Sequence, residues 1–164
     1  AHRRENFGVP MRAICLALRQ ICERTPDVTL VFPVHFNPNL REIVFPELSG
    51  VPRIHLLDPV DYLTMIGLID RAYLILTDSG GIQEEAAALG RPTLVLREKT
   101  ERVEGVEAGV ARLVGTRTET IVNEAITLLR DPEAHARMLR ASNCYGDGRA
   151  AGRIVDTVRR WRPR

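Results

Sequence analysis

The stretch from Tyr73 to Gly90 places the strongest constraint on the fold of this chain. Its sequence, YLILTDSGGIQEEAAALG, reads as a short buried strand, a polar turn, two glycines and a helix. The first N–H groups of such a helix have no partner within the helix, and the helix dipole is positive there. Gly80 and Gly81 let a phosphate approach the main chain, and Ser79 adds a hydroxyl donor. The stretch therefore predicts a phosphate site at the start of a helix.

Glu85 follows Gly81 by four residues, so it lies one turn further along the same face of the helix. A carboxylate there can accept hydrogen bonds from two vicinal hydroxyls, such as those of a ribose. Glu84 lies about 100° away around the helix and is expected to matter less. These positions suit a nucleoside diphosphate with its sugar at Glu85. The same sequence also fits an ordinary turn between strand and helix, with glycines that serve packing and glutamates that are solvated. The nucleotide site and the ordinary turn both stay open at this point.

Strand-like and helix-like segments alternate along the whole chain. The apolar run 28–34 is typical of a strand buried on both faces of a parallel sheet. Thr116 and Glu119 fit a capping box before a helix that runs to Arg130. The alternation predicts an α/β fold with a Rossmann-like open parallel sheet and helices on both faces. The expected strands cover 28–34, 53–57, 73–76, 93–96 and 110–114, and the expected helices cover 11–24, 39–48, 58–69, 82–90, 116–130, 132–141 and 151–161, with a loop and short helix in 97–109.

Composition excludes several classes of protein. The 164 residues suffice for one domain, and a net charge of +2 with 5% aromatic residues argues against a nucleic-acid partner. Cys15, Cys22 and Cys144 form no C-x-x-C pair, so neither a disulfide framework nor a metal site is expected. No apolar run reaches membrane length and no signal peptide opens the chain, so we expect a cytoplasmic protein without a membrane partner. GDGRAAG at 146–152 has the wrong spacing for a dinucleotide fingerprint and follows no strand.

Ligands of open parallel sheets bind beyond the carboxyl ends of the strands. His35 follows a predicted strand, where it fits either a structural histidine or a ligand contact. The run His2 to Glu5 fits a solvated charge cluster, although its cations also suit a pyrophosphate. That run reads as a loop leaving a strand, so we expect the chain to be cut from a longer protein just after a strand of this sheet. The polar residues expected at the strand ends are Arg3, His35, Asp58, Asp78, Ser79, Glu85 and 97–104.

Several stretches together resemble, in order, the C-terminal half of the non-hydrolysing UDP-N-acetylglucosamine 2-epimerases. They are HRRENFG, FPVHFNPN, LLDPVDYLTMI, LTDSGGIQEEAAALGRPTLVLREKTERVEG and NCYGDGRAAGRI, which cover nearly the whole chain. The resemblance implies a two-domain, glycosyltransferase-B-like fold with the active site between two Rossmann-like domains. Residues 1–164 would then be the C-terminal UDP-binding domain, without its first strand and without the N-terminal domain.

The resemblance also implies roles for individual residues. His2 matches an active-site histidine near the UDP phosphates, and Arg3 and His35 match residues of an allosteric site for a second UDP-N-acetylglucosamine in bacterial members. No metal or other cofactor is implied. The implied UDP contacts are Ser79, Gly80 and Gly81 at the diphosphate, Glu85 at the ribose, Arg102 at the nucleotide, and Met65 with nearby Val60 at the uracil.

The implied reaction interconverts UDP-N-acetylglucosamine and UDP-N-acetylmannosamine by eliminating UDP and adding it back. The acid and base carboxylates belong to the missing N-terminal domain, so the isolated chain is expected to be inactive. The implied partners are the nucleotide sugar as substrate and activator, the N-terminal domain, and a second copy in a homodimer that serves polysaccharide biosynthesis. A UDP-sugar glycosyltransferase of the same fold, a hydrolysing epimerase and a nucleotide-binding regulatory module without chemistry are the alternatives.

Overall fold

The protein, as a computed structural model, is described over residues 1–139 and 144–161, and it confirms the alternation of strands and helices. Its strands are β1 (Leu30–Pro33), β2 (Ile54–Leu57), β3 (Ile75–Thr77), β4 (Thr93–Val95) and β5 (Ala111–Leu113). Its helices are the short 3-10 helix η1 (Arg4–Asn6), α1 (Val9–Arg24), α2 (Pro38–Leu48), α3 (Tyr62–Arg71), α4 (Gly80–Ala88), α5 (Val103–Glu107), α6 (Thr118–Arg130), α7 (Pro132–Leu139) and α8 (Ala150–Arg160).

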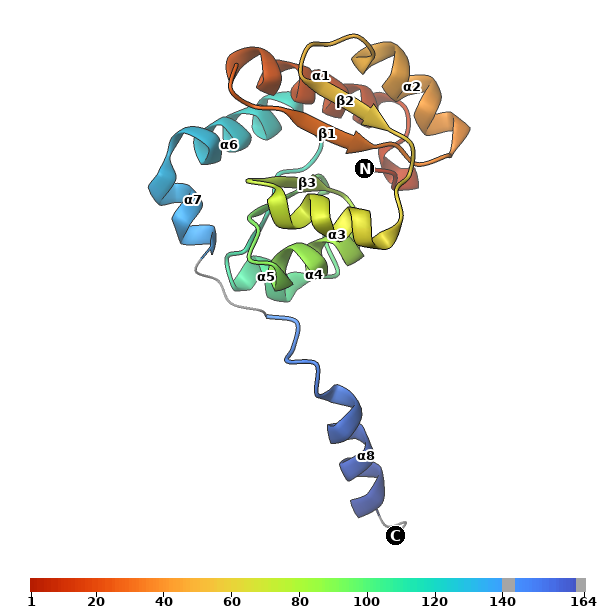
Figure 1. Cartoon of the computed structure of the whole chain (residues 1–164), viewed down its shortest axis with the longest axis vertical. Coiled ribbons are helices and arrows are strands. Elements are labelled where there is room, and N and C mark those ends of the chain that lie inside the picture. Colours follow the sequence, from red (N-terminus) through yellow and green to blue (C-terminus); the bar gives the residue numbers. More distant parts are fainter. Residues whose placement is uncertain (140–143, 162–164) are drawn as a thin grey trace.

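Every strand pair in the described residues is parallel, as the sequence predicts. β1 pairs with β2, with Leu30 opposite Ile54. β4 lies between β3 and β5, with Leu94 opposite Leu76 on one side and Arg112 on the other. The pairing thus forms a two-stranded and a three-stranded sheet, and no pairing joins them in the described part of the chain (Figure 1). The expected strand before His2 stays a prediction.

The helices pack in two groups around the strands. α1 packs against α2 and α6, whereas α4 packs against α3 and α5 (Figure 1). The first group buries the main core because the apolar residues of α1 recur at helical spacing on one face. These packed helices hold the ends of the strands in place. The largest fully buried side chains are Met11, Ile14, Leu40, Leu48, Leu94, Leu96, Ile121 and Leu128.

Two local predictions in the first half of the chain were wrong. Val31 in β1 is 42% exposed while Phe32 is buried, because alternate side chains point to opposite faces and one face is left uncovered. α3 begins at Tyr62 and not at position 58, because the Asp61 side chain accepts a hydrogen bond from the N–H of Thr64 at 3.0 Å. The loop expected at His2 to Glu5 also contains the short helix η1.

The predicted capping box before α6 was wrong as well. α6 begins at Thr118, with Arg117 at the N-cap and no side-chain cap. The hydroxyl of Thr118 donates instead to the carbonyl oxygen of Ala13 at 2.9 Å. A tertiary contact with α1 therefore sets the start of this helix.

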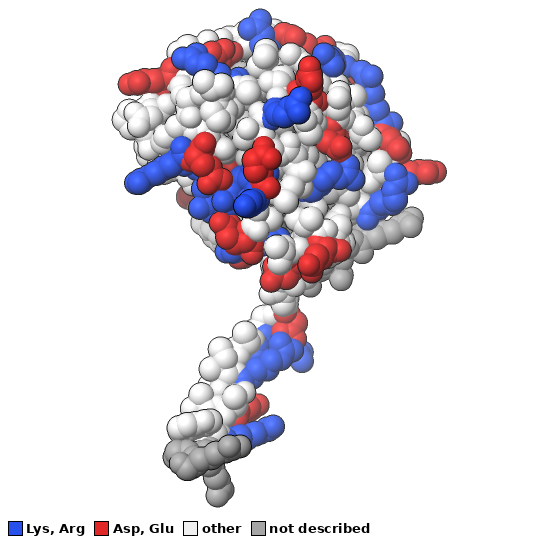
Figure 2. Space-filling view, turned by 180° about the vertical axis from the view of Figure 1, so that it is seen from behind, with Lys and Arg blue, Asp and Glu red and all other residues white. Residues whose placement is uncertain are grey.

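α8 extends away from the rest of the chain (Figure 1). All of its residues are exposed, including Ile154, Val155 and Val158, which recur at helical spacing. Figure 2 shows charged residues along one side of α8 and uncharged residues along the other. The predicted helix end near position 141 lies outside the described residues. No helix in the described ranges is long and apolar enough to span a membrane.

Candidate functional site

The turn between β3 and α4 leaves a hydroxyl at the start of the helix. Ser79 is the N-cap of α4, but its side chain makes no capping hydrogen bond. Its N–H donates to the hydroxyl of Thr77 at 3.0 Å, and its carbonyl accepts from the side chain of Gln83 at 3.2 Å. These main-chain contacts fix the turn and leave the Ser79 hydroxyl available to a ligand.

Gly80 and Gly81 provide space at this helix start. Neither has a positive φ angle, so the main chain here does not require glycine for its conformation. A Cβ atom at Gly80 would lie 3.5 Å from the guanidinium of Arg102, and one at Gly81 would meet no atom within 4 Å. The first turn of α4 is therefore covered by Arg102 at Gly80 and open at Gly81.

Arg102 reaches this position from the loop before α5. Its Nε donates to the carboxylate of Glu84, and its N–H donates to the hydroxyl of Thr100 at 3.1 Å. The Thr100 hydroxyl in turn donates to the side chain of Gln83 on α4 at 2.9 Å. The sequence does not predict the contact of Glu84 with Arg102, because residues in a helix and in a distant loop carry no spacing signal.

Glu85 differs from Glu84 in having no partner among the described residues. Its carboxylate makes no hydrogen bond or ion pair with any residue that the structure describes. Burial, and next the negative charge of Glu84, raise the pKa of Glu85 above its usual value. A half-buried carboxylate beside the helix start is thus available to the hydroxyls of a ligand.

A buried carboxylate at the end of β3 holds the first residues of the chain. Asp78 is 0% exposed and accepts hydrogen bonds at 2.9 Å from the N–H groups of His2 and Arg3 and from the side chain of Asn6. Arg3 also donates from Nε to the Asp78 carbonyl at 3.3 Å. The run that begins at His2 is therefore anchored directly beside the turn at Ser79.

His2 and His35 stack on each other with ring centroids 5.2 Å apart. His35 is exposed and its Nδ1 accepts from the N–H of Asn37 at 3.1 Å, so it is not a buried structural histidine. Burial lowers the pKa of His2 below 6.5, although the carboxylate of Asp78 acts against this change. The structure thus brings His2 and Arg3 to Asp78 and stacks His35 on His2.

Met65 and Val60 lie in a neighbouring part of the fold. Met65 is in the first half of α3, which packs against α4, and Val60 is in the loop before α3. The N–H of Met65 donates to the carbonyl of Asp61 at 3.0 Å within the helix. Its main-chain donor is therefore already used within the first turn of the helix.

Arg97 fixes the loop that carries Arg102. Its buried guanidinium donates to Glu5 at 2.7 Å and to Glu101 at 2.8 Å. The hydrogen bonds from Arg97 are the main reason that the pKa of Glu101 is lowered to about 2. The loop after β4 is thus joined to η1, next to the residues that Asp78 holds.

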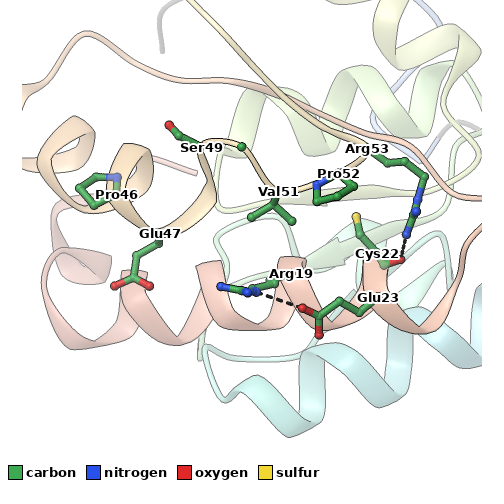
Figure 3. A pocket seen from close by; sticks show the side chains of 10 residues that line it. Arg19, Cys22, Glu23, Pro46, Glu47, Ser49, Val51, Pro52 and Arg53 are labelled. Carbon is green, nitrogen blue, oxygen red and sulfur yellow. Dashed lines mark hydrogen bonds and ion pairs between the residues drawn. The ribbon is translucent and has the colours of Figure 1, made fainter.

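A separate pocket lies between α1 and the turn that joins α2 to β2 (Figure 3). Its arginines are already engaged, since Arg19 pairs with Glu23 at 3.0 Å and Arg53 donates to the carbonyl of Cys22. These two arginines are therefore not available to bind an anionic ligand in this pocket. In the described residues no group of three or more His, Cys, Asp or Glu side chains is arranged to hold a metal ion.

Comparison with known proteins agrees with this geometry. The family described as UDP-N-acetylglucosamine 2-epimerase matches residues 1–159. A protein of Ralstonia nicotianae named "Probable UDP-N-acetylglucosamine 2-epimerase" is 54% identical over 96% of this chain and 42% of its own length. The UDP-N-acetylglucosamine 2-epimerase of Escherichia coli K12 is 50% identical over 96% of this chain and 42% of its own length.

A solved structure is similar over almost the same range. The UDP-GlcNAc 2-epimerase from Neisseria meningitidis bound to UDP-GlcNAc has a TM-score of 0.93 and 42% identity, and the match covers 98% of this chain and 43% of that one. The predicted α/β fold of the glycosyltransferase-B type is thereby confirmed. The chain spans about two fifths of the length of the curated relatives that it matches. On these matches, the chain belongs to the UDP-N-acetylglucosamine 2-epimerase family.

Proposed function

We propose that this chain is the C-terminal, nucleotide-binding half of an enzyme that interconverts UDP-N-acetylglucosamine and UDP-N-acetylmannosamine. The observation that carries the proposal is the open helix start at Ser79 and Gly81, with the guanidinium of Arg102 over Gly80. Helix dipole, main-chain N–H groups and guanidinium all favour a diphosphate at this point. The Neisseria meningitidis relative, which is bound to UDP-GlcNAc, supports the choice of ligand.

Each part of the nucleotide has a candidate contact. The diphosphate lies at Ser79, Gly80 and Gly81 with Arg102 beside it, and the ribose hydroxyls donate to Glu85. This assignment uses the one carboxylate of the pair 84 and 85 that has no partner among the described residues. The uracil lies at Met65 and Val60, at the start of α3.

The reaction proceeds by elimination and re-addition of UDP. A base removes the proton from C2 of the sugar, a double bond forms between C1 and C2, and the bond from C1 to the diphosphate oxygen breaks with its electron pair on UDP. UDP then returns to C1 while an acid delivers a proton to the opposite face of C2. The acid and base are carboxylates of an N-terminal domain.

In this scheme the chain holds the leaving group. Negative charge develops on UDP as the bond breaks, and Arg102 with the N–H groups of the α4 start stabilises that charge without rearrangement. His2 acts beside the phosphates, since its loop is hydrogen-bonded to Asp78 next to Ser79. Retention of UDP between the two steps allows epimerisation instead of hydrolysis.

A second nucleotide sugar binds as an activator at Arg3, which donates to Asp78, and at His35, which stacks on His2. The complete enzyme is a homodimer that acts in the cytoplasm in polysaccharide biosynthesis. The three unpaired cysteines of the described residues fit that reducing compartment.

Incubation of the full-length protein with UDP-N-acetylglucosamine in deuterium oxide tests the proposal. We expect deuterium at C2 and signals of the manno epimer in the proton NMR spectrum. Transfer of the sugar to an acceptor would instead support a glycosyltransferase, and accumulation of free N-acetylmannosamine with UDP would support a hydrolysing epimerase. Binding without any of these products would support a regulatory module.

A further inference from the structure

The loop before α8 returns to the candidate site through Tyr145. The hydroxyl of Tyr145 donates to the carbonyl oxygen of Arg102 at 3.4 Å. The same hydroxyl oxygen lies against the main chain of Gly105. One side chain from the end of the chain therefore contacts main-chain groups at both ends of the turn from Arg102 to Gly105.

Gly105 leaves room for this hydroxyl. Gly105 is buried, and a Cβ atom built on it would lie 2.3 Å from the Tyr145 oxygen and 3.2 Å from the ring carbon that bears it. Any side chain at this position would displace the hydroxyl, because real Cβ contacts are not that short. The glycine and the tyrosine are thus fitted to each other across 40 residues of sequence.

The turn that Tyr145 contacts carries the guanidinium that covers Gly80. The side-chain partner of Arg102 is Glu84, but the two side chains are 36% and 44% exposed. Ion pairs with that exposure fix a side chain weakly. The direction of the Arg102 side chain therefore depends on how firmly its main chain is held.

The hydroxyl of Tyr145 is a suitable group for this purpose. Burial raises the pKa of the Tyr145 hydroxyl above its usual value, and the nearby carboxylates of Glu104 and Glu84 add to this effect. The group thus stays protonated at neutral pH and keeps its proton for the carbonyl of Arg102.

We propose that Tyr145 is a positioning residue that holds the main chain of Arg102 so that its guanidinium faces a nucleotide diphosphate at the start of α4. The inference rests on the proposed function insofar as it makes the diphosphate the ligand of Arg102. It gives a role in phosphate binding to Tyr145, which directly precedes the stretch GDGRAAG that does not fit a dinucleotide fingerprint.

Tyr145→Phe in the full-length protein tests the proposal by calorimetry with UDP and by NMR titration with uridine. The change removes one hydroxyl, so we expect the Kd for UDP to rise by about 5-fold, in keeping with the loss of a single hydrogen bond. The Kd for uridine should not change, because uridine has no phosphate for Arg102. Tyr73→Phe is the matched control, since the ring of Tyr73 stacks on His135 with centroids 3.7 Å apart, and it should leave both values unchanged.

Gly105→Ala gives a second, independent test. The added methyl group would collide with the Tyr145 hydroxyl, whose oxygen is 2.3 Å from it. In Tyr145→Phe that oxygen is absent, and the nearest ring carbon is 3.2 Å away. Gly105→Ala should therefore weaken UDP binding strongly in the native background and much less in the Tyr145→Phe background. Equal losses in the two backgrounds would overturn the proposed contact.

The remaining outcomes separate this inference from the proposed function. Equal weakening of UDP and uridine by Tyr145→Phe would mean that Tyr145 supports the fold in general, and would overturn the positioning role. If the native protein binds no UDP, the proposed function fails, and hydrogen exchange of the Gly105 amide still decides the role of Tyr145. Faster exchange of that amide in Tyr145→Phe supports the restraint of the Arg102 turn, and unchanged exchange overturns it.

Discussion

The carboxylate of Asp78 accepts a hydrogen bond from the main-chain N–H of His2, with both of its oxygens 2.9 Å from that nitrogen. This contact joins the end of β3 to a residue 76 positions earlier in the chain. The hydrogen bond comes from the main chain of His2, while the imidazole stacks on His35 with its Nδ1 3.9 Å from the same carboxylate. Asp78 therefore holds the loop through its main chain and also acts on the charge of the imidazole.

Asp78→Asn should lower the free energy of unfolding by about 2–4 kcal/mol at pH 7. An amide offers one acceptor oxygen where the carboxylate accepts from His2, Arg3 and Asn6, and it lacks the negative charge. Urea unfolding followed by circular dichroism measures the change. Asp27→Asn, at an exposed residue, is the control and should stay within about 0.5 kcal/mol of the native protein.

The same residue predicts a pH dependence of stability. Burial alone would raise the pKa of Asp78, but the amino group of Ala1 and the N–H donors outweigh it and hold the pKa below 3.8. A lowered carboxyl pKa contributes stability that is present above pH 3.8 and is lost as the pH falls through the folded-state value. The native protein should therefore lose stability more steeply below about pH 4 than Asp78→Asn does. Parallel pH profiles of the two proteins would contradict the assignment.

His2→Ala should reduce turnover far more than stability. The imidazole is partly exposed and the anchoring hydrogen bonds come from the main chain, which the substitution keeps. We expect unfolding within about 0.5 kcal/mol of native and a kcat lower by about 100-fold, as for loss of an acid–base or charge-stabilising group. An enzyme that melts early but keeps its specific activity in the folded fraction would show that His2 is structural.

Glu85→Ala should weaken UDP binding by about 1.5–3 kcal/mol, the scale of hydrogen bonds to a charged group. If the carboxylate contacts the ribose, 2′-deoxy-UDP should bind native protein more weakly than UDP does, and Glu85→Ala should remove that difference. Calorimetry with both nucleotides measures the effect. Glu107→Ala, at an exposed glutamate of α5, should change neither affinity.

Glu84→Gln should have a smaller effect than Glu85→Ala. Glu84 pairs with Arg102, but the pair is partly exposed. Its loss should therefore weaken the binding of UDP by about 0.5–1 kcal/mol. The affinity for uridine should stay the same, because the change acts through the guanidinium at the phosphates. If Glu84→Gln weakened UDP binding more than Glu85→Ala does, Glu84 and not Glu85 would be the glutamate that contacts the nucleotide.

The 164-residue chain on its own should not epimerise UDP-N-acetylglucosamine, and should bind UDP weakly or not at all. It carries the α4 start, Glu85 and Met65, but the proposed acid and base lie in another domain. Closure of a cleft positions the substrate and excludes water, which together supply several kcal/mol of barrier lowering. Proton NMR of the anomeric signals checks this, and conversion to the manno epimer by the purified chain would place the chemistry here.

Local sequence patterns account for most of the elements and for the core of the candidate site. The run of β3, turn, glycines and α4 falls within a few residues of its predicted place, because strand, N-cap and helix signals are all local. The helical spacing of α1 likewise predicts its buried face, which includes Met11 and Ile14. The start of α6 could not be predicted, because it depends on the contact of Thr118 with a carbonyl in α1.

The sequence by itself determined the order of strands and helices, the parallel α/β fold and the helix start at Ser79 to Gly81. Only the tertiary structure decided which distant side chains complete that helix start. It joined Asp78 to His2, Arg102 to Glu84 and Tyr145 to Gly105. The physical reason is that helix and strand periodicity depends on near neighbours, whereas these contacts depend on how packed elements bring separate loops to one edge of the sheet.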